Sequence, residues 1–517
     1  MIGAEALLRT LVGSGVNVCF ANPGTSEMHF VAALDAVSEM RGVLVLFEGV
    51  ATGATDGYAR MTGAPAVALL HLGPGLGNGL ANLHNARRSR VPVVTVVGDH
   101  ASYHKRFDAQ LESDIESVAR NVSGWIRRTA RAEDTGPDAA DAVAAALGPP
   151  AQVATLILPA DASWSDGAAP AAAPPRPRYG AVPAAEIESI AATLRNGQRC
   201  GLLLGGAALQ ERGLRAAARI AAECGIELFA ETFPTRLARG AGLPAVERLP
   251  YLAELAKGQL EGLQHLFLAD ARAPVSFFAY PGKPSYLVPD QCDVGVLAGG
   301  ADDVPAALEA LADAVDAGSD SGGAPAARPR RPGGELTAET VGQALGALLP
   351  EDAIVSDEAN TSGIYMTGPT AGAPPHDWLT LTGGSIGQGL PVAVGAAVAQ
   401  PGRRVIALEA DGSALYTIQS LWTMAREQLD VTVVLLSNRR YAILRMELAR
   451  VGATASGERA SAMLDIGDPD IDFVALARGL GVPASRPGTA EEFTTELERS
   501  LATPGPSLIE AVVPSIF

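Results

Sequence analysis

Residues 405–441 constrain the fold of this chain more than any other stretch, because they have the pattern of a strand, a helix and a second strand. The apolar run VIAL precedes Asp411-Gly412, apolar residues then recur at helical spacing, and VTVVLL follows. Two parallel strands joined by a right-handed crossover end at the same edge of a sheet. We therefore predict an α/β fold with Asp411 and Asn438 together at that edge.

Asp411 and Asn438 are candidate ligands of a metal ion. A carboxylate, an amide oxygen and a free carbonyl beyond the second strand make half of an octahedral oxygen shell, and Mg²⁺ commonly takes the rest from phosphates and water. The alternative is ordinary turn chemistry, since Asp-Gly is a common turn pair and asparagine often follows a strand. The residues alone leave both interpretations open.

Two segments of unusual composition divide the chain of 517 residues, which is long enough for about three domains. Proline and alanine dominate residues 168–182, and glycine, serine and proline are frequent in residues 317–335. We predict three doubly wound parallel-sheet domains at 1–170, 183–316 and 336–517, with 317–335 as a flexible linker.

Charge and cysteine content exclude several classes of function. A formal net charge of −18 argues against nucleic acid or an acidic membrane as a partner. The four cysteines have no C-x-x-C spacing, so neither a disulfide framework nor a zinc site is expected. The chain begins without a leader-like segment and has no apolar run of membrane length. These features predict a cytoplasmic protein.

Three further polar residues follow apolar runs in the first predicted domain. Glu48 comes directly after a predicted strand at 42–47, and His71 ends a strand that leads into a predicted glycine-rich loop at 73–79. His104 lies in the loop after the next strand. Each has a plain structural alternative: a glutamate in the first turn of a helix, a satisfied histidine at a strand end, and a solvated loop residue.

The unit at 405–441 resembles the thiamine diphosphate motif of the family that contains pyruvate decarboxylases, benzoylformate decarboxylases and acetolactate synthases. The shared features are Asp411-Gly412-Ser413, the crossover, and Asn438 followed by Tyr441. The overall pattern is closest to benzoylformate decarboxylase. The resemblance implies that Mg²⁺ is held by Asp411, Asn438 and the Arg440 carbonyl. It also implies that the cofactor contacts Thr25, Asn360, Thr361, Gly384, Ile386, Gly412, Ser413 and Tyr441.

The same resemblance implies catalytic roles for Glu48, His71 and His104. In the family, one glutamate hydrogen-bonds the aminopyrimidine ring and favours the tautomer that takes a proton from the thiazolium carbon. A bulky residue, here Ile386, wedges under the cofactor, and the Gly384 carbonyl accepts from its aminopyrimidine. Histidines in the positions of His71 and His104 serve as acids or bases in benzoylformate decarboxylase and pyruvate decarboxylases.

The implied reaction is decarboxylation of a 2-oxoacid, carboligation to an aldehyde or 2-oxoacid acceptor, or both, through an enamine intermediate. An acetolactate synthase-like ligase without FAD is one alternative, and a non-catalytic cofactor-binding or regulatory subunit is another. FAD is not expected, because the segment after 265–270 lacks the synthase pattern. In the family, Glu48 of one subunit would meet the diphosphate site of another, so a homodimer or homotetramer is implied.

Several positions depart from these relatives. Gln110-Leu111-Glu112 stands where acetolactate synthases have Phe-Gln-Glu, and Phe278 or Ala279 replaces a second catalytic histidine of benzoylformate decarboxylase. Glu447 occupies a position that is apolar in the latter and suggests a more polar substrate. Residues 453–467 are polar and contain glycine, which is typical of a mobile lid.

Overall fold

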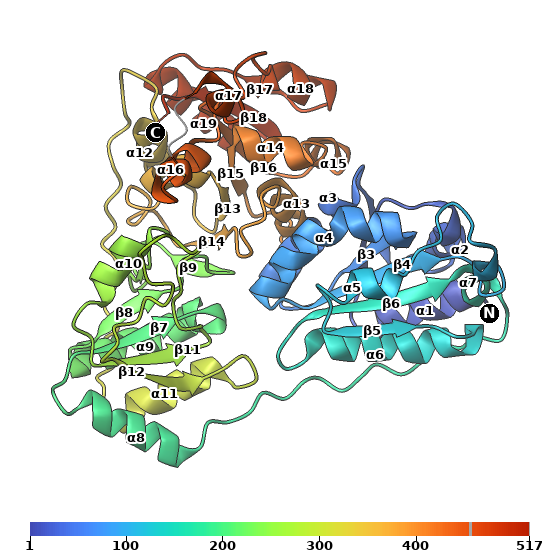
Figure 1. The fold of residues 1–517 in the computed structure, drawn as a ribbon, viewed down its shortest axis with the longest axis horizontal. Helices are drawn as coiled ribbons and strands as arrows, with labels where there is room; N and C mark the ends of the chain where they lie inside the picture. Colours follow the sequence, from blue (N-terminus) through green and yellow to red (C-terminus); the bar gives the residue numbers. More distant parts are fainter. Residues whose placement is uncertain (454–456, 516–517) are drawn as a thin grey trace.

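Three open sheets flanked by helices make up the computed structural model of the chain (Figure 1). It describes residues 1–453 and 457–515. Almost all strand pairs are parallel, so the predicted α/β class with three doubly wound sheets is confirmed. None of the described helices combines the length and the apolar character that a membrane span requires.

The first sheet has six parallel strands in the order β2-β1-β3-β4-β6-β5. Every residue of the adjacent interior strands β4 and β6 is buried, as expected for strands covered on both faces. The strands are β1 (Val18–Ala21), β2 (Arg41–Leu44), β3 (Val67–His71), β4 (Val93–Asp99), β5 (Trp125–Arg128) and β6 (Val153–Pro159). The helices are α1 (Gly3–Gly13), α2 (Met28–Ala36), α3 (Glu48–Thr62), α4 (Leu72–Ser89), α5 (Ile115–Ala119), α6 (Thr135–Leu147) and α7 (Ala160–Trp164).

The second sheet has five parallel strands in the order β10-β8-β7-β11-β12. A long extended segment carries the chain to it from α7 (Figure 1). Its strands are β7 (Cys200–Leu204), β8 (Glu227–Ala230), β10 (Glu247–Arg248), β11 (His265–Ala269) and β12 (Asp293–Ala298). Its helices are α8 (Ala184–Leu194), α9 (Glu211–Cys224), α10 (Ala253–Leu260) and α11 (Val304–Ala314).

The third sheet has seven strands in the order β17-β18-β16-β15-β13-β14-β9. Only β9 is antiparallel to its neighbour, and it comes from the chain between β8 and β10. The strands are β9 (Leu237–Arg239), β13 (Ile354–Glu358), β14 (His376–Thr380), β15 (Val405–Ala410), β16 (Val431–Ser437), β17 (Ala484–Ser485) and β18 (Ser507–Val512). The helices are α12 (Ala338–Leu348), α13 (Gly389–Ala399), α14 (Asp411–Thr417), α15 (Ser420–Arg426), α16 (Ala442–Arg450), α17 (Glu458–Ala462), α18 (Phe473–Gly479) and α19 (Ala490–Ala502).

Three local predictions were wrong. The strand expected at 42–47 ends at Leu44, and the helix expected between Asp411 and Val431 is two short helices, α14 and α15. The glycine-rich stretch 73–79 is not a loop but the first two turns of α4. Close packing requires its glycines: a Cβ on Gly79 would lie 2.8 Å from Thr52 Cγ2 of α3.

Helices α3 and α13 join the first sheet to the third, and they lie side by side in Figure 1. A Cβ on Gly57 of α3 would lie 2.2 Å from the Val392 carbonyl oxygen, and one on Gly395 of α13 would lie 1.9 Å from the Ala54 oxygen. The two backbones approach closely because both helices have glycine at the contact. The starts of α3 and α13 are thereby held near each other.

Candidate functional site

The carboxyl ends of β15 and β16 bring Asp411 and Asn438 to one edge of the third sheet. Ala410 pairs with Leu436 in the parallel register, so the residues that follow each strand are neighbours. Asp411 Oδ2 accepts from the Arg439 backbone N–H at 2.6 Å, and Oδ1 accepts from that of Gly412 at 2.8 Å. Burial raises the pKa of the Asp411 carboxyl, and these backbone donors oppose the rise.

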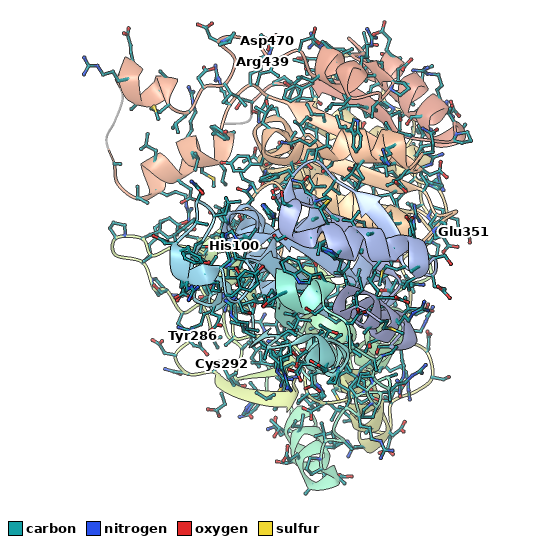
Figure 2. All side chains as sticks on the ribbon, turned by 90° about the vertical axis from the view of Figure 1, so that its right-hand side faces the viewer. His100, Tyr286, Cys292, Glu351, Arg439 and Asp470 are labelled. Carbon is teal, nitrogen blue, oxygen red and sulfur yellow. The ribbon has the colours of Figure 1, made fainter. Side chains whose placement is uncertain are left out.

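A tight turn after β16 fixes the second predicted ligand. Asn438 Oδ1 accepts from the Arg440 N–H at 3.0 Å. Between them Arg439 has a φ of +59°, and its side chain pairs with Asp470 at 2.8 Å, which Figure 2 shows at the top of the molecule. The turn therefore presents amide and backbone oxygens beside the Asp411 carboxylate.

The chain after β13, the strand on the other side of β15, contacts the first turn of α14. Asn360, with a φ of +49°, donates from Nδ2 to Ser413 Oγ at 2.8 Å, and Thr361 follows it. Tyr441 covers the start of α14, since a Cβ on Gly412 would lie 2.5 Å from Tyr441 Cε1. The structure thus gathers these predicted cofactor contacts around the first turn of α14.

The donor set fits a metal ion that is shared with phosphates. The described residues contain no group of three or more His, Cys, Asp or Glu side chains that could hold a metal ion alone. Asp411 is the single carboxylate among the predicted metal ligands, and an Mg²⁺ ion there needs further oxygens from a ligand or water. A diphosphate supplies such oxygens, and the start of a helix favours an anion.

The segment 383–389, between β14 and α13, lies next to the end of β13. Gly384 and Gly387 have φ values of +75° and +92°, which favour glycine, and Ile386 between them is half-buried. The Phe277 ring packs against the backbone, because a Cβ on Gly384 would lie 2.4 Å from Phe277 Cζ. Phe277 contacts three other aromatic rings, those of Phe233, Tyr251 and Phe278.

Two buried carboxyl groups beneath this segment were not predicted. Glu358, at the end of β13, accepts from the N–H groups of Gly387 and Gly389 at 2.7 and 2.5 Å. Glu409 lies against the same point, since a Cβ on Gly389 would be 2.4 Å from its Oε2. Burial raises the pKa of Glu358 to about 7, and burial together with the neighbouring Glu358 raises the pKa of Glu409 well above its usual range. Each of these two glutamates follows apolar strand residues in the sequence, and this pattern could have indicated a buried carboxyl group.

Glu48 begins α3 and is 7% exposed. Its Oε2 accepts from Asn78 Nδ2 at 3.0 Å. Within the described residues of one chain, no hydrogen bond or ion pair joins the Glu48 carboxylate to Asp411, Asn438 or Ser413. His71 lies nearby, because a Cβ on Gly75 would be 3.2 Å from Glu48 Oε1 and 3.4 Å from His71 Cβ.

His71 is paired with Glu27, a residue that the sequence analysis missed. Glu27 is 1% exposed, and its Oε2 accepts from His71 Nδ1 at 2.9 Å and from the Gly24 N–H at 2.7 Å. A carboxylate accepts only, so Nδ1 carries the proton and Nε2 is left to exchange one. The bond to Gly24 belongs to a capping box, and a glutamate three residues after a helix start was its sequence signal.

The remaining predicted residues of the first sheet are more exposed. Thr25 and His104 both reach solvent, and the His104 ring lies 5.3 Å from that of His100. His100, labelled in Figure 2, has a buried Nε2 without a partner among the described residues. Lys105 in the same loop binds Asp99 and Glu112, so its charge is neutralised. The described residues include no hydrogen bond or ring contact between His104 and either His71 or Glu48.

Glu447 is already engaged by protein groups. Its Oε1 accepts from the Tyr251 hydroxyl at 3.1 Å, and Arg450 lies 3.5 Å from the same atom. Its Oε2 is buried without a partner in the described chain. The expected lid at 453–467 is described in part only: residues 454–456 lie outside the described residues, and α17 lies within the rest.

We expect Glu27→Gln to lower kcat/KM by about 10- to 100-fold, because glutamine offers one uncharged acceptor oxygen where the two Glu27 oxygens serve His71, Gly24 and Ser26, so the His71 tautomer is held less firmly. Steady-state kinetics with the best substrate found for the wild type measure the effect. Glu39→Gln, a substitution at an exposed position of the same domain, is the matched control and should be silent. Equal kinetics for Glu27→Gln and the wild type would show that the Glu27–His71 pair has no part in turnover.

Comparisons with known proteins cover both halves of the site. Residues 1–119 match the family "Thiamine pyrophosphate enzyme, N-terminal TPP binding domain", and residues 365–511 match the corresponding C-terminal TPP binding domain. The first match contains Glu48 and His71, and the second contains the unit from Asp411 to Tyr441.

Relatives extend over the whole chain. A Mycobacterium tuberculosis protein with the provisional name acetolactate synthase large subunit IlvX is 60% identical over 519 residues, with 100% of both chains covered. Benzoylformate decarboxylase of Pseudomonas aeruginosa is 31% identical, with 97% of each chain covered. The solved structure of a Rhodococcus jostii RHA1 thiamine diphosphate-dependent 4-hydroxybenzoylformate decarboxylase superposes with a TM-score of 0.86 at 26% identity, with 99% of each chain covered.

Proposed function

This chain belongs to the thiamine pyrophosphate enzymes, and from that membership we propose that it uses thiamine diphosphate and Mg²⁺ to act on a 2-oxoacid. The reaction is decarboxylation, or transfer of the resulting acyl fragment to an aldehyde or a second 2-oxoacid. The observation that carries this proposal is the meeting of Asp411, Asn438, Ser413 and Asn360 at the edge of the third sheet. The proposal does not include FAD.

The residues at this edge bind and orient the cofactor. Asp411, Asn438 and the Arg440 carbonyl hold Mg²⁺, while the first turn of α14 and the Asn360-Thr361 turn hold the diphosphate. Gly384 and Ile386 support the ring half of the cofactor. When bound, thiamine diphosphate would supply a carbanion as the nucleophile toward a carbonyl and an electron sink for the electron pair that CO₂ leaves behind.

The residues of the first sheet bind and transfer protons. Glu48 holds a proton at the aminopyrimidine ring, which is general acid–base catalysis applied to the cofactor itself. Glu27 keeps the proton of His71 on Nδ1, so His71 Nε2 is free to exchange one with the substrate. His104 and Thr25 complete the proposed site from the exposed loops.

A cluster of aromatic side chains in the second domain indicates the size of the substrate. The aromatic rings of Phe233, Tyr251, Phe277 and Phe278 meet beside Gly384, where the ring half of the cofactor would lie. Phe277 and Phe278 are 42% and 54% exposed and offer apolar surface to a ligand. This favours a 2-oxoacid with a bulky apolar or aryl group, as in the named decarboxylases, over a small one.

The proposed assembly is a homodimer or homotetramer in the cytoplasm, with the site shared between subunits. Glu48 of one chain would face the Asp411 edge of another. Exposed apolar side chains near both halves support such a contact, namely Leu46, Ile364, Leu415 and Tyr416. All four cysteines are free, which suits a reducing compartment.

A product survey tests the function. The protein with thiamine diphosphate and Mg²⁺ is given aryl, branched and small 2-oxoacids, with and without aldehyde acceptors, and products are identified by mass spectrometry. We expect CO₂ and an aldehyde from a decarboxylase, and a 2-hydroxyketone or a 2-hydroxy-3-oxoacid from a ligase. Cofactor binding without any turnover across the panel would favour the non-catalytic subunit instead.

A further inference from the structure

Helix α4 carries three asparagines, Asn78, Asn82 and Asn85, whose spacing of four and three residues places them on one face. Asn78 Nδ2 donates to Glu48 Oε2 at 3.0 Å. Asn82 and Asn85 are 2% and 0% exposed, so their amide groups must find partners within the protein. We call these three residues the asparagine ladder.

The ladder connects the start of α3 with the segment 383–389, about 300 residues further along the chain. Asn82 Nδ2 donates to the Gly49 carbonyl at 2.8 Å and to the Gly387 carbonyl at 3.0 Å. Asn85 Nδ2 donates to the Ser385 carbonyl at 2.8 Å, and its Oδ1 accepts from the Ser385 N–H at 3.2 Å. Asn85 also donates to Asn82 Oδ1 at 3.0 Å, so the two amides support each other.

The third sheet holds the same segment from the other side. Glu358 accepts from the Gly387 and Gly389 N–H groups, and the Thr417 hydroxyl donates to the Gly387 carbonyl at 3.1 Å. Peptide groups of residues 383, 385, 387 and 389 are therefore hydrogen-bonded to side chains. In the described chain, no hydrogen bond uses the Gly384 carbonyl or the peptide groups of Ile386. The Gly384 N–H donates to the Leu381 carbonyl at 3.4 Å, while the Gly384 carbonyl, which is assigned to the cofactor, is left free among the described residues.

We propose that Asn82 and Asn85 are positioning residues, through which α4 and the start of α3 hold the Gly384–Ile386 stretch of the same chain in place. This inference rests on the proposed function, because Gly384 and Ile386 matter as the seat of the cofactor's ring half. An asparagine suits the position since it donates two hydrogen bonds and accepts others without placing a charge between two carbonyl oxygens. Among the described residues, the ladder makes no hydrogen bond to the proposed diphosphate contacts, so we expect its effect to be confined to the ring half.

Two substitutions test the ladder. Asn85→Asp keeps the acceptor for the Ser385 N–H but replaces the donor to the Ser385 carbonyl with a repelling oxygen. Asn82→Ser leaves a single donor for two carbonyls. Asn196→Ala, which removes an exposed amide far along the chain, is the control. Circular dichroism checks the fold of each protein, and either ladder variant alone suffices if the other does not fold.

Calorimetry then measures two ligands, thiamine diphosphate and inorganic pyrophosphate, each with Mg²⁺. We expect the ladder variants to raise the Kd for thiamine diphosphate by about tenfold, while the Kd for pyrophosphate stays within about twofold of the wild type. An equal loss for both ligands would mean general damage and overturn the proposal, as would no loss for either. A wild-type protein that binds pyrophosphate but not thiamine diphosphate would refute the proposed function itself.

Discussion

Replacing Glu48 with glutamine is expected to lower kcat by about 10²- to 10⁴-fold while thiamine diphosphate still binds. Glutamine keeps the shape of the side chain and the partner Asn78, but it cannot hold the proton that activates the aminopyrimidine. The loss should therefore appear in turnover and not in affinity. Steady-state kinetics and calorimetric titration of the cofactor measure the two separately.

The control for this substitution is Glu188→Gln, at an exposed position of α8. It changes the net charge equally and should leave kcat unchanged. If Glu48→Gln turned over like the wild type, Glu48 would be only a residue of the first helical turn. A loss of affinity equal to the loss of turnover would instead assign it to binding.

Asp411→Asn is expected to weaken Mg²⁺-dependent binding of thiamine diphosphate by at least about 100-fold. Loss of a residue that merely supports a metal ligand typically costs 10- to 100-fold in affinity, and Asp411 is the single carboxylate of the proposed shell. Asparagine retains an acceptor for the Arg439 or Gly412 N–H, so the turn itself should persist. Calorimetry at several Mg²⁺ concentrations measures the effect.

Asp470→Asn is the matched control. Asp470 pairs with Arg439 in the same turn, but its side chain is 47% exposed and its ion pair is worth little. We expect the affinity of the Asp470→Asn protein for the cofactor to match that of the wild type within about twofold. Comparable weakening in both variants would place the effect in the turn and remove Asp411 from the metal shell.

The sequence was most informative where local pattern and topology agree. The strands around Asp411 and Asn438 are apolar runs joined by one crossover, so parallel pairing and a shared edge follow from general rules of α/β sheets. The glycine-rich stretch 73–79 was misjudged because glycine suits both a loop and a tightly packed helix, and packing against α3 decides between them.

The parts of the site that escaped prediction are pairings between distant residues. Glu27 and His71 are 44 positions apart, and Asn82 and Gly387 are 305 apart, so no local period reveals either contact. Strand β9 has three residues and pairs across from another part of the chain. Such contacts depend on how whole sheets are placed, which a single sequence does not encode in any short window.

The most direct measurement of the central claim is hydrogen–deuterium exchange at the thiazolium carbon of thiamine diphosphate, bound with Mg²⁺ and followed by NMR after acid quenching. We predict exchange in the wild type that is faster than in free cofactor by about 10²-fold or more, and exchange in Glu48→Gln that is close to the free rate. Bound cofactor that exchanged at the free rate in the wild type would contradict the account and leave a protein that binds thiamine diphosphate without activating it.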